Sequence, residues 1–483
     1  MLLPDEVREA RRPKPLREWR NLARAAVRGI GEEIRHDRSM LRDVAATDLR
    51  DEVTDLLQRL IRVDTTNPPG NETAAAELLR DYLAANGVES QLIAKVPERA
   101  NLVARIPGGG GPSLLLLCHT DVVYADPADW TVPPFSGELR DGVVWGRGAL
   151  DMKSQVAANA VAIASLAREG FTPSGDLIFV ATADEEQGGG GHGDNGYGLQ
   201  WLCEEHPDAV RCDYAINEGG GERLELADGT SVYQATVAEK MTAPFRLRVH
   251  GRAGHASMPR IADNALVNAA KLVDRIAAYR PEPQIGPEVE AFLRALLGEV
   301  PAAHEAAARV GKLDPAAGAL VDALLAPTFS PTIISASQKR NVIPAMCEVE
   351  VDCRLLPGQH PEHIEPMIRA VLGSDIEYDL EWIDARGGTR SALETPLWTA
   401  LEEFVGEAVP RAKVGPLMCA GFTDSHWLRE AFGTVAYGFF PSSGELPAEV
   451  AATLVHSADE RIPVADLELG VRWLRHAAHS MLG

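Results

Sequence analysis

Six side chains that can bind metals or move protons are spread along the sequence. They are His119, Asp151, Glu185, Glu186, Glu218 and His456. Several of them follow short apolar runs that are typical of buried parallel strands. Five of the six could hold two metal ions above the edge of a sheet, and the remaining one, Glu185, could take a proton from water held there. This pattern predicts a two-metal hydrolase.

The pair His119 and Asp121 comes directly after an apolar run at 114–118. Residues two apart on an extended chain point to the same side. Asp121 could therefore accept a hydrogen bond from the far ring nitrogen of a metal-bound His119 and fix its tautomer. A surface turn is the alternative explanation of this pair.

Asp151 follows the tripeptide Gly146-Arg147-Gly148 at a distance of a few residues. The two glycines let the backbone bend tightly before a carboxylate that is expected to open a helix. Such a carboxylate can bridge two metal ions through its two oxygens. A helix N-cap is the alternative, although a cap does not require the two glycines.

The other candidates come from three further segments. Glu185 and Glu186 follow the apolar run at 177–181 and point in different directions, so one can bind a metal while the other accepts a proton. Taken in isolation, the tripeptide Asp184-Glu185-Glu186 would be better explained as a solvated acidic turn. Glu218 precedes three glycines that permit close approach of a metal or ligand. His456 completes the set, and Glu460 is expected to orient it.

Size, charge and cysteine content narrow the class of protein. A chain of 483 residues predicts about two to three domains. The net charge of -23 argues against nucleic-acid binding, which needs a basic surface. The six cysteines form no CxxC pair, which is typical of a reducing compartment. No run approaches the roughly 20 apolar residues of a membrane span, and no signal peptide is recognised, so we expect a cytoplasmic protein without membrane contact.

The order of apolar runs predicts the organisation of the chain. Strands alternate with helices up to about residue 237, which favours an α/β fold with a mostly parallel sheet covered on both faces. The pattern then changes to that of a small inserted α+β domain, in which 280–332 supplies additional helices. The expected boundaries are 1–47 for an N-terminal helical extension, 48–237 and 387–483 for the two parts of the catalytic domain, and 238–386 for the insert.

The motifs together resemble those of the M20 metallopeptidase family, over about 48–483. They are DTTNPPGNE, the His-x-Asp pair, GRGALDMKS, the two adjacent glutamates, NEGG and HSADE. The family includes aminoacylase-1, acetylornithine deacetylase, succinyl-diaminopimelate desuccinylase and carboxypeptidase G-type enzymes. The resemblance implies two zinc ions, for which cobalt can substitute. It places one zinc on His119, Asp151 and Glu218 and the other on Asp151, Glu186 and His456, with Asp121 as the supporting carboxylate and Glu185 as the general base.

The same resemblance implies that the insert is a lid and dimerisation domain. His255, within GRAGHAS, would polarise the scissile carbonyl, often from the neighbouring subunit of a homodimer. Asn341 and Arg354 would hold the substrate, and Arg354 would grip a carboxylate with its planar fork. Gly421, within GFTD, matches a glycine-bearing substrate loop.

These features predict a dizinc hydrolase that cleaves an amide bond in a small N-acyl amino acid or dipeptide with a free carboxylate. One alternative is a biosynthetic deacylase that acts on acetylornithine or succinyl-diaminopimelate. Another is a catalytically silent dimeric binding protein. The complete set of five metal-type ligands and Glu185 argues against the silent protein.

Overall fold

The computed structural model describes residues 46–187, 196–226 and 228–483. The chain divides into two units, Met1–Asp48 and Leu49–Gly483, and the second unit carries all the elements discussed below except the first three residues of helix α3. The N-terminal helical extension expected at 1–47 lies outside the described residues up to residue 45.

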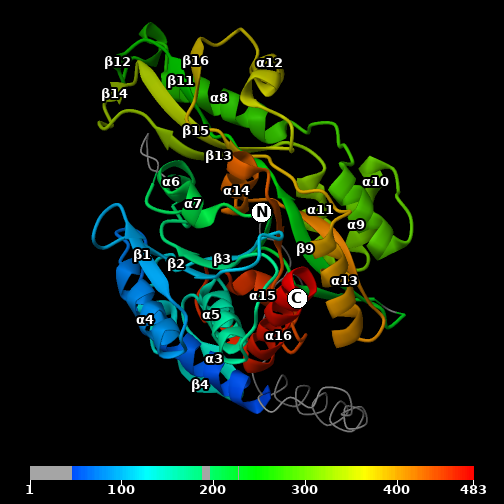
Figure 1. Ribbon diagram of the computed structural model, residues 1–483. Helices are drawn as coiled ribbons and strands as arrows, with labels where there is room; N and C mark the ends of the chain where they lie inside the picture. Colours follow the sequence, from blue (N-terminus) through cyan, green and yellow to red (C-terminus); the bar gives the residue numbers. More distant parts are fainter. Residues whose placement is uncertain (1–45, 188–195, 227) are drawn as a thin grey trace. The chain divides into compact units, whose positions relative to one another are not determined.

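A nine-stranded sheet organises the larger part of this unit (Figure 1). Its order is β1-β2-β6-β3-β7-β19-β9-β18, with β8 beside β9. The central strands β6, β3, β7 and β19 are parallel to their neighbours in this run, whereas β1 and β2 are added in antiparallel fashion. This centre confirms the predicted α/β class. The strands are β1 (Ser90–Ala94), β2 (Ala100–Ile106), β3 (Leu114–His119), β6 (Leu177–Thr182), β7 (Tyr214–Asn217), β8 (Arg223–Glu225), β9 (Ser231–Glu239), β18 (Ala412–Cys419) and β19 (Val435–Gly438).

The burial of strand β3 shows that the large sheet is covered on both faces. All six of its residues are buried. Leu114 and Leu116 belong to the hydrophobic core on one face, and Leu115 and Leu117 to the core on the other. This alternation follows from the two-residue period of a strand, and an unbroken apolar run is the pattern of a strand buried on both sides.

Helices supply the covering layers. Helix α5 packs on β3 and is buried from Lys153 to Leu166, as expected of a helix between a sheet and another helix, here α16. Helices α6 and α14 contribute to the core on the opposite face. The helices of this part are α3 (Ala46–Ile61), α4 (Glu72–Ala85), α5 (Lys153–Arg168), α6 (Leu199–Glu205), α7 (Pro207–Val210), α13 (Pro396–Ala408), α14 (Ser425–Phe432), α15 (Ala448–Leu454) and α16 (Val464–Leu482).

The inserted segment forms a second sheet with a hydrophobic core of its own, made by residues between Met241 and Ile376. Strand β15 alternates buried and partly exposed residues, because only one face of this sheet is covered by helices. The sheet contains β10 (Met241–Thr242), β11 (Phe245–His250), β13 (Thr328–Ser335), β15 (Met346–Leu355), β16 (Tyr378–Trp382) and β17 (Arg386–Gly387), with helices α8 (Ala265–Ala278) and α12 (Pro361–Leu372).

The helices between these strands pack differently from the expectation. They are α9 (Pro287–Leu297), α10 (Ala303–Gly311) and α11 (Pro315–Leu324). We expected them to belong to the insert, but their buried side chains join the core of the large sheet, where α9 contacts β9 and β18. Phe292 illustrates this packing. Its ring lies close to the backbone of Gly415 in β18, where the absence of a side chain leaves room for it.

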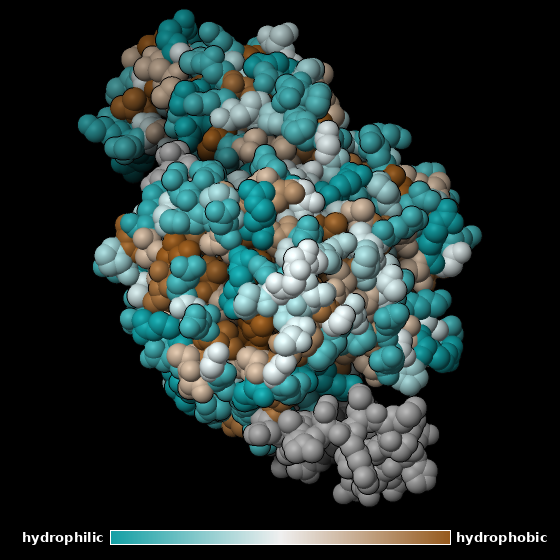
Figure 2. Space-filling view, in the orientation of Figure 1, coloured by the Kyte–Doolittle hydropathy of each residue, from teal (hydrophilic) through white to brown (hydrophobic). Residues whose placement is uncertain are grey.

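Smaller elements complete the described chain. A three-stranded sheet has the order β20-β5-β4, and β12 pairs with β14. Their bounds, with those of the two short 3-10 helices, are η1 (Pro127–Asp129), β4 (Glu138–Arg140), β5 (Val143–Trp145), β12 (Gly254–His255), η2 (Pro259–Ile261), β14 (Val342–Ile343) and β20 (Arg461–Pro463). Among the described residues no helix is long and apolar enough to cross a membrane. The face shown in Figure 2 is mainly hydrophilic, with hydrophobic patches between.

Candidate metal centre

His119 is the last residue of β3 and is buried. Its two ring nitrogens face different partners. Nδ1 lies 3.0 Å from the backbone carbonyl oxygen of Asp121 and 3.5 Å from the Asp121 carboxylate. The carbonyl is therefore the nearer acceptor, which differs from the carboxylate contact expected from the sequence. A proton on Nδ1 leaves the lone pair of Nε2 free for a metal ion.

Asp151 lies between the two histidines. Its Oδ1 is 3.1 Å from Nε2 of His119, and its Oδ2 is 3.0 Å from Nε2 of His456. Helix α5 begins two residues later, and its N-cap is Met152, so Asp151 is not the helix cap. The tight approach to Asp151 uses Gly148, whose φ of +86° is a conformation that favours glycine. Asp151 is thus placed as a bridging carboxylate would be.

Two glutamates complete the pairs with the histidines. Glu218 follows β7, and its Oε2 lies 3.5 Å from Nε2 of His119. Glu186 lies after β6, and its Oε2 is 3.1 Å from Nε2 of His456. The structure therefore brings together all five predicted metal ligands, although their segments lie far apart in the sequence.

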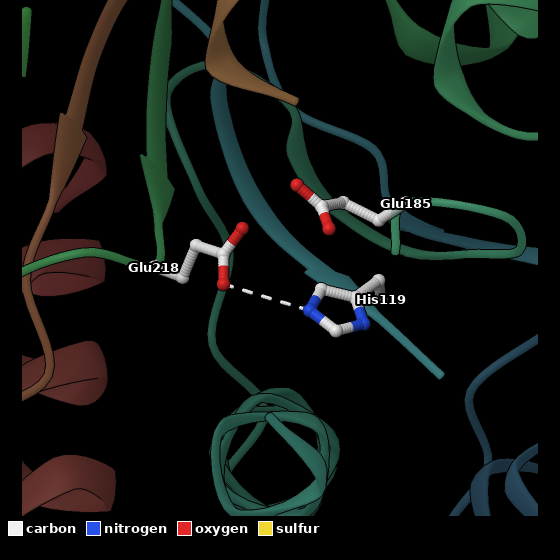
Figure 3. Close-up of side chains that lie close together, drawn as sticks. All are labelled: His119, Glu185 and Glu218. Atoms are coloured by element: carbon white, nitrogen blue, oxygen red, sulfur yellow. Dashed lines mark ion pairs between the residues drawn. The ribbon is translucent and has the colours of Figure 1, made fainter. Parts of the chain in front are cut away.

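Glu185 lies inside the same cluster. Figure 3 shows its side chain directed toward the space beside His119 and Glu218. Ligand atoms of these three residues lie within 4.8 Å of one another, as do those of His119, Asp151 and Glu186. Glu185 is therefore close enough to act on water held by the cluster, which is the position that its predicted role requires.

The electrostatics of the cluster suit a divalent cation. Burial, followed by the nearby charge of Glu218, raises the pKa of Glu185 well above its ordinary value. Burial likewise raises the pKa of Glu186 and of Glu218. Oε1 of Glu186 is buried without a hydrogen-bond partner among the described residues. Four acids gathered around two histidines need positive charge, and this mixture of nitrogen and oxygen ligands fits zinc and related ions.

Asp121 supports the two glutamates as well as the histidine. Its two carboxylate oxygens accept hydrogen bonds from the backbone N–H groups of Glu185, at 3.2 Å, and Glu186, at 3.1 Å. The side-chain amide of Asn67 donates to Asp121 at 2.9 Å and to Asp184 at 2.9 Å. Asp121 therefore holds the backbone from which both the predicted base and a predicted ligand project.

A buried ion network extends this support and was not predicted. Arg99 forms an ion pair with Glu72 at 2.6 Å and with Asp184 at 2.8 Å, and all three side chains are buried. Asp184 directly precedes Glu185 and has a φ of +66°, a conformation that its hydrogen bonds hold in place. The motif DTTNPPGNE contains Asn67 and Glu72, and was the one signal in the sequence that pointed to this network.

Glu460 was expected to orient His456, but its hydrogen bonds go to the loop that carries Asp151. Its carboxylate accepts hydrogen bonds from the side chain of Arg147, at 2.6 Å, and from the backbone N–H of Gly148, at 3.1 Å. It also accepts from the N–H groups of Leu150, at 2.7 Å, and Asp151, at 2.9 Å. Glu460 therefore fixes the loop that carries the bridging carboxylate.

Replacement of Glu460 by glutamine is expected to destabilise the protein and weaken metal binding. The change leaves the guanidinium of Arg147 buried without its counterion and turns an amide N–H₂ toward two backbone donors. Loss of one partner from a buried ion pair costs about 3–5 kcal/mol in free energy of unfolding. Urea denaturation and metal analysis measure the two effects. Glu449→Gln, on the exposed side of α15, is the control, and equal stability of the two variants would contradict this role.

The predicted residues of the insert are not brought to this cluster within the chain. A cavity of about 390 Å³ is lined by four of the five predicted ligands, all except His119, and by Glu185, and its lining includes no residue of 238–386. His255 is exposed and its Nδ1 lies 2.8 Å from the hydroxyl of Ser257. It lies beside Asn341, whose carbonyl accepts a hydrogen bond from Ala256 at 3.1 Å.

The two remaining predicted substrate residues, Arg354 and Gly421, lie in different parts of the chain. Arg354 makes two parallel hydrogen bonds of 2.9 Å with the carboxylate of Asp352 and a third of 2.7 Å with Thr242. Its planar fork is thus already engaged with an acid. Gly421 follows β18, and its N–H donates to the sulfur of Cys419, which lines the cavity.

Comparison with known proteins agrees with this geometry. The sequence model of peptidase family M20/M25/M40 matches residues 115–480. The chain belongs to this family. It is accordingly a metal-dependent hydrolase that acts on amide bonds, and not the silent binding protein considered above. Membership implies a divalent metal, for which the cluster supplies suitable ligands.

Several similar relatives with curated names are succinyl-diaminopimelate desuccinylases. That of Cereibacter sphaeroides is 29% identical over 433 residues, which cover 85% of this chain and 93% of the relative. That of Paracoccus denitrificans is 34% identical over 224 residues, which cover 46% of this chain and 55% of the relative. The second match therefore spans only about half of that protein.

Two solved structures share the fold. An M20 family metallo-carboxypeptidase from Sulfolobus solfataricus aligns with a TM-score of 0.66 at 17% identity, covering 89% of this chain and 99% of the other. Human carnosine dipeptidase 1 aligns with a TM-score of 0.62 at 14% identity, covering 90% and 98%. These alignments show that the large sheet and the insert form the arrangement of an M20 hydrolase.

Proposed function

We propose that this M20 hydrolase uses two zinc ions to cleave the amide bond of a small N-acyl amino acid or dipeptide with a free carboxylate. One observation carries the proposal. The two oxygens of Asp151 face different histidines, each of which has a glutamate of its own beside it. A single shared carboxylate between two such pairs is the arrangement that a two-metal site needs.

Metal analysis tests this proposal directly. Protein purified with excess zinc is expected to hold about two zinc ions per chain, because the cluster offers two groups of ligands that share Asp151. Chelation should abolish amide hydrolysis, and zinc or cobalt should restore it. Asp151→Ala should lose both ions, since both groups include this residue. Protein without bound transition metal under these conditions would refute the two-metal site.

The residues of the cluster have separate parts in the reaction. When bound, zinc lowers the pKa of water toward about 7 and polarises a carbonyl group. Glu185 accepts the proton of the attacking water and returns it to the nitrogen of the leaving amine. Asp121 keeps Glu185 in place through the backbone hydrogen bond, and Asp121 and Glu460 hold the two loops on which Glu186 and Asp151 stand.

The insert is proposed to bind the substrate. Arg354 uses three of its five N–H groups for Asp352 and Thr242, which holds the guanidinium plane fixed while a substrate carboxylate approaches the others. Asn341 directly precedes β14, and His255 lies on the neighbouring β12, where it pairs with Val342. His255 is proposed to donate a hydrogen bond to the oxygen of the scissile carbonyl, and Gly421 to form part of the substrate loop.

A homodimer would bring these residues to a metal cluster. Strand β13 lies at the edge of the small sheet, where it pairs with β15, and its Ile333 and Ile334 are exposed. An exposed edge strand with apolar side chains is a surface on which a second strand can pair. Met258, Val342 and Met346 are exposed in the same domain. We place this dimer in the cytoplasm, in agreement with six free cysteines.

A biosynthetic deacylase remains the second candidate. The names of the curated relatives favour succinyl-diaminopimelate as its substrate. Both candidates use the same cluster and the same reaction, and differ in the groups that flank the amide bond. Comparison of kcat/KM for N-succinyl-diaminopimelate and for N-acetyl amino acids separates them.

A further inference from the structure

The cavity that contains the metal cluster continues along a wall without charged groups. The wall comes from one stretch of chain, 440–462, which also carries His456. Apart from Ser442 and His456, its cavity-lining side chains are apolar: Phe440, Leu446, Ala448, Ala451, Ala452, Val455 and Ile462. We call these seven residues the apolar wall.

Helix α15 supplies three residues of this wall. Ala448, Ala451 and Ala452 have the spacing i, i+3 and i+4, which places side chains on one face of a helix, and Val455 follows as the C-cap of the helix. The exposed Thr453 lies outside this face and does not line the cavity. Three alanines at these positions leave space that larger side chains would fill.

Phe440, at the other end of the wall, is held firmly. Its ring lies on the backbone of Gly470 in α16, where an added Cβ would come within 2.3 Å of two ring carbons. The backbone N–H of Phe440 donates to the carbonyl of Gly220, at 3.0 Å, in the loop that follows Glu218. Phe440 is therefore fixed relative to one of the metal ligands.

Charged side chains at the margin of the cavity do not favour an anionic substrate group. Arg223 is engaged by Glu225 at 2.8 Å and by the hydroxyl of Ser231 at 3.0 Å. Glu222 and Asp466, which also line the cavity, are acids. A carboxylate placed against the wall would lose water and meet two acids without an unengaged base among the lining residues.

We propose that the apolar wall is a subsite for an apolar group of the substrate. This group is an aliphatic or aromatic acyl chain, or an apolar side chain of the amino acid, next to the amide bond. The inference rests on the proposed amide hydrolysis and specifies its substrate class. It disfavours succinyl groups, which end in a carboxylate.

Two substrate series test the subsite and distinguish the two sources of the apolar group. One is N-acyl-alanine with acyl chains from acetyl to hexanoyl and with succinyl, and the other is N-acetyl amino acids from alanine to leucine and phenylalanine. Each methylene that enters the subsite is expected to raise kcat/KM about threefold, so hexanoyl should exceed acetyl by about 10²-fold if the acyl chain binds there. A rise in the second series alone assigns the subsite to the amino-acid side chain.

A matched pair of variants locates the effect on α15. Ala451→Phe fills the face toward the cavity and should remove the preference for large apolar groups while acetyl-alanine is still cleaved. Thr453→Phe adds the same ring on the same helix outside the cavity and should leave the preference unchanged. Flat series in the unaltered protein, or equal behaviour of the two variants, would overturn the subsite.

Binding separates failure of the subsite from failure of the proposed function. Hexanoate, acetate and succinate are titrated into the zinc-loaded protein by calorimetry. Tighter binding of hexanoate, lost in Ala451→Phe and kept in Thr453→Phe, supports the subsite even if none of the amides is cleaved, in which case only the proposed function fails. Binding of succinate as tight as that of hexanoate overturns the subsite.

Discussion

Replacement of Glu185 by glutamine is expected to lower turnover about 10²–10⁴-fold and to leave the metal content unchanged, because the amide cannot accept a proton from water. The substitution keeps the shape of the side chain. The backbone of Glu185 remains tied to Asp121, so the neighbouring ligand Glu186 should keep its position. Turnover under saturating substrate and zinc per chain are the two measurements.

Glu186→Gln is the matched control for this result. It stands one residue away, and its carboxylate lies beside His456 rather than between His119 and Glu218. It should lower zinc content, because an amide oxygen is a weaker ligand than a carboxylate. If Glu185→Gln loses zinc while Glu186→Gln keeps zinc and loses only turnover, the roles of the two glutamates are reversed. Unchanged turnover in Glu185→Gln would exclude it as the base.

The residues that could be predicted from the sequence share a local pattern. The runs at 114–118 and 177–181 are apolar throughout, because β3 and β6 are buried on both faces, and polar residues directly after them mark the edge of the sheet. His119 stands directly after the first run, and Glu186 stands five residues after the end of the second. The glycines before Asp151 were a second local signal, and the φ of Gly148 shows the turn that required them.

The features that were missed depend on contacts between distant segments. Arg99 has no local pattern around it, and its role follows only from the fold, which places it against Glu72 and Asp184. Glu460 was expected to act on His456, four residues away, whereas it binds the loop at 147–151. The position of α9–α11 was missed for the same reason, since an amphipathic helix does not reveal which of two cores it covers.

The second large effect on turnover is expected from replacement of His255. His255→Ala is expected to lower turnover about 10²–10³-fold, the cost of one lost donor to the oxygen of a tetrahedral intermediate. Metal content should not change, because the described lining of the metal-site cavity contains no residue of the insert. His360→Ala removes another exposed histidine of the same domain and should have little effect. A similar loss in both variants would show a general disturbance of the insert.

Mixing two inactive proteins decides whether His255 acts on the partner subunit. A dimer of one Glu185→Gln chain and one His255→Ala chain contains one site with an intact Glu185 and an intact His255 only if the histidine crosses the interface. Random exchange makes half of the dimers mixed, and each has one such site, so about a quarter of the normal activity should return. Subunit exchange is verified with chains of different mass. Exchange without recovered activity would mean that His255 acts within its own chain or has no part in the reaction.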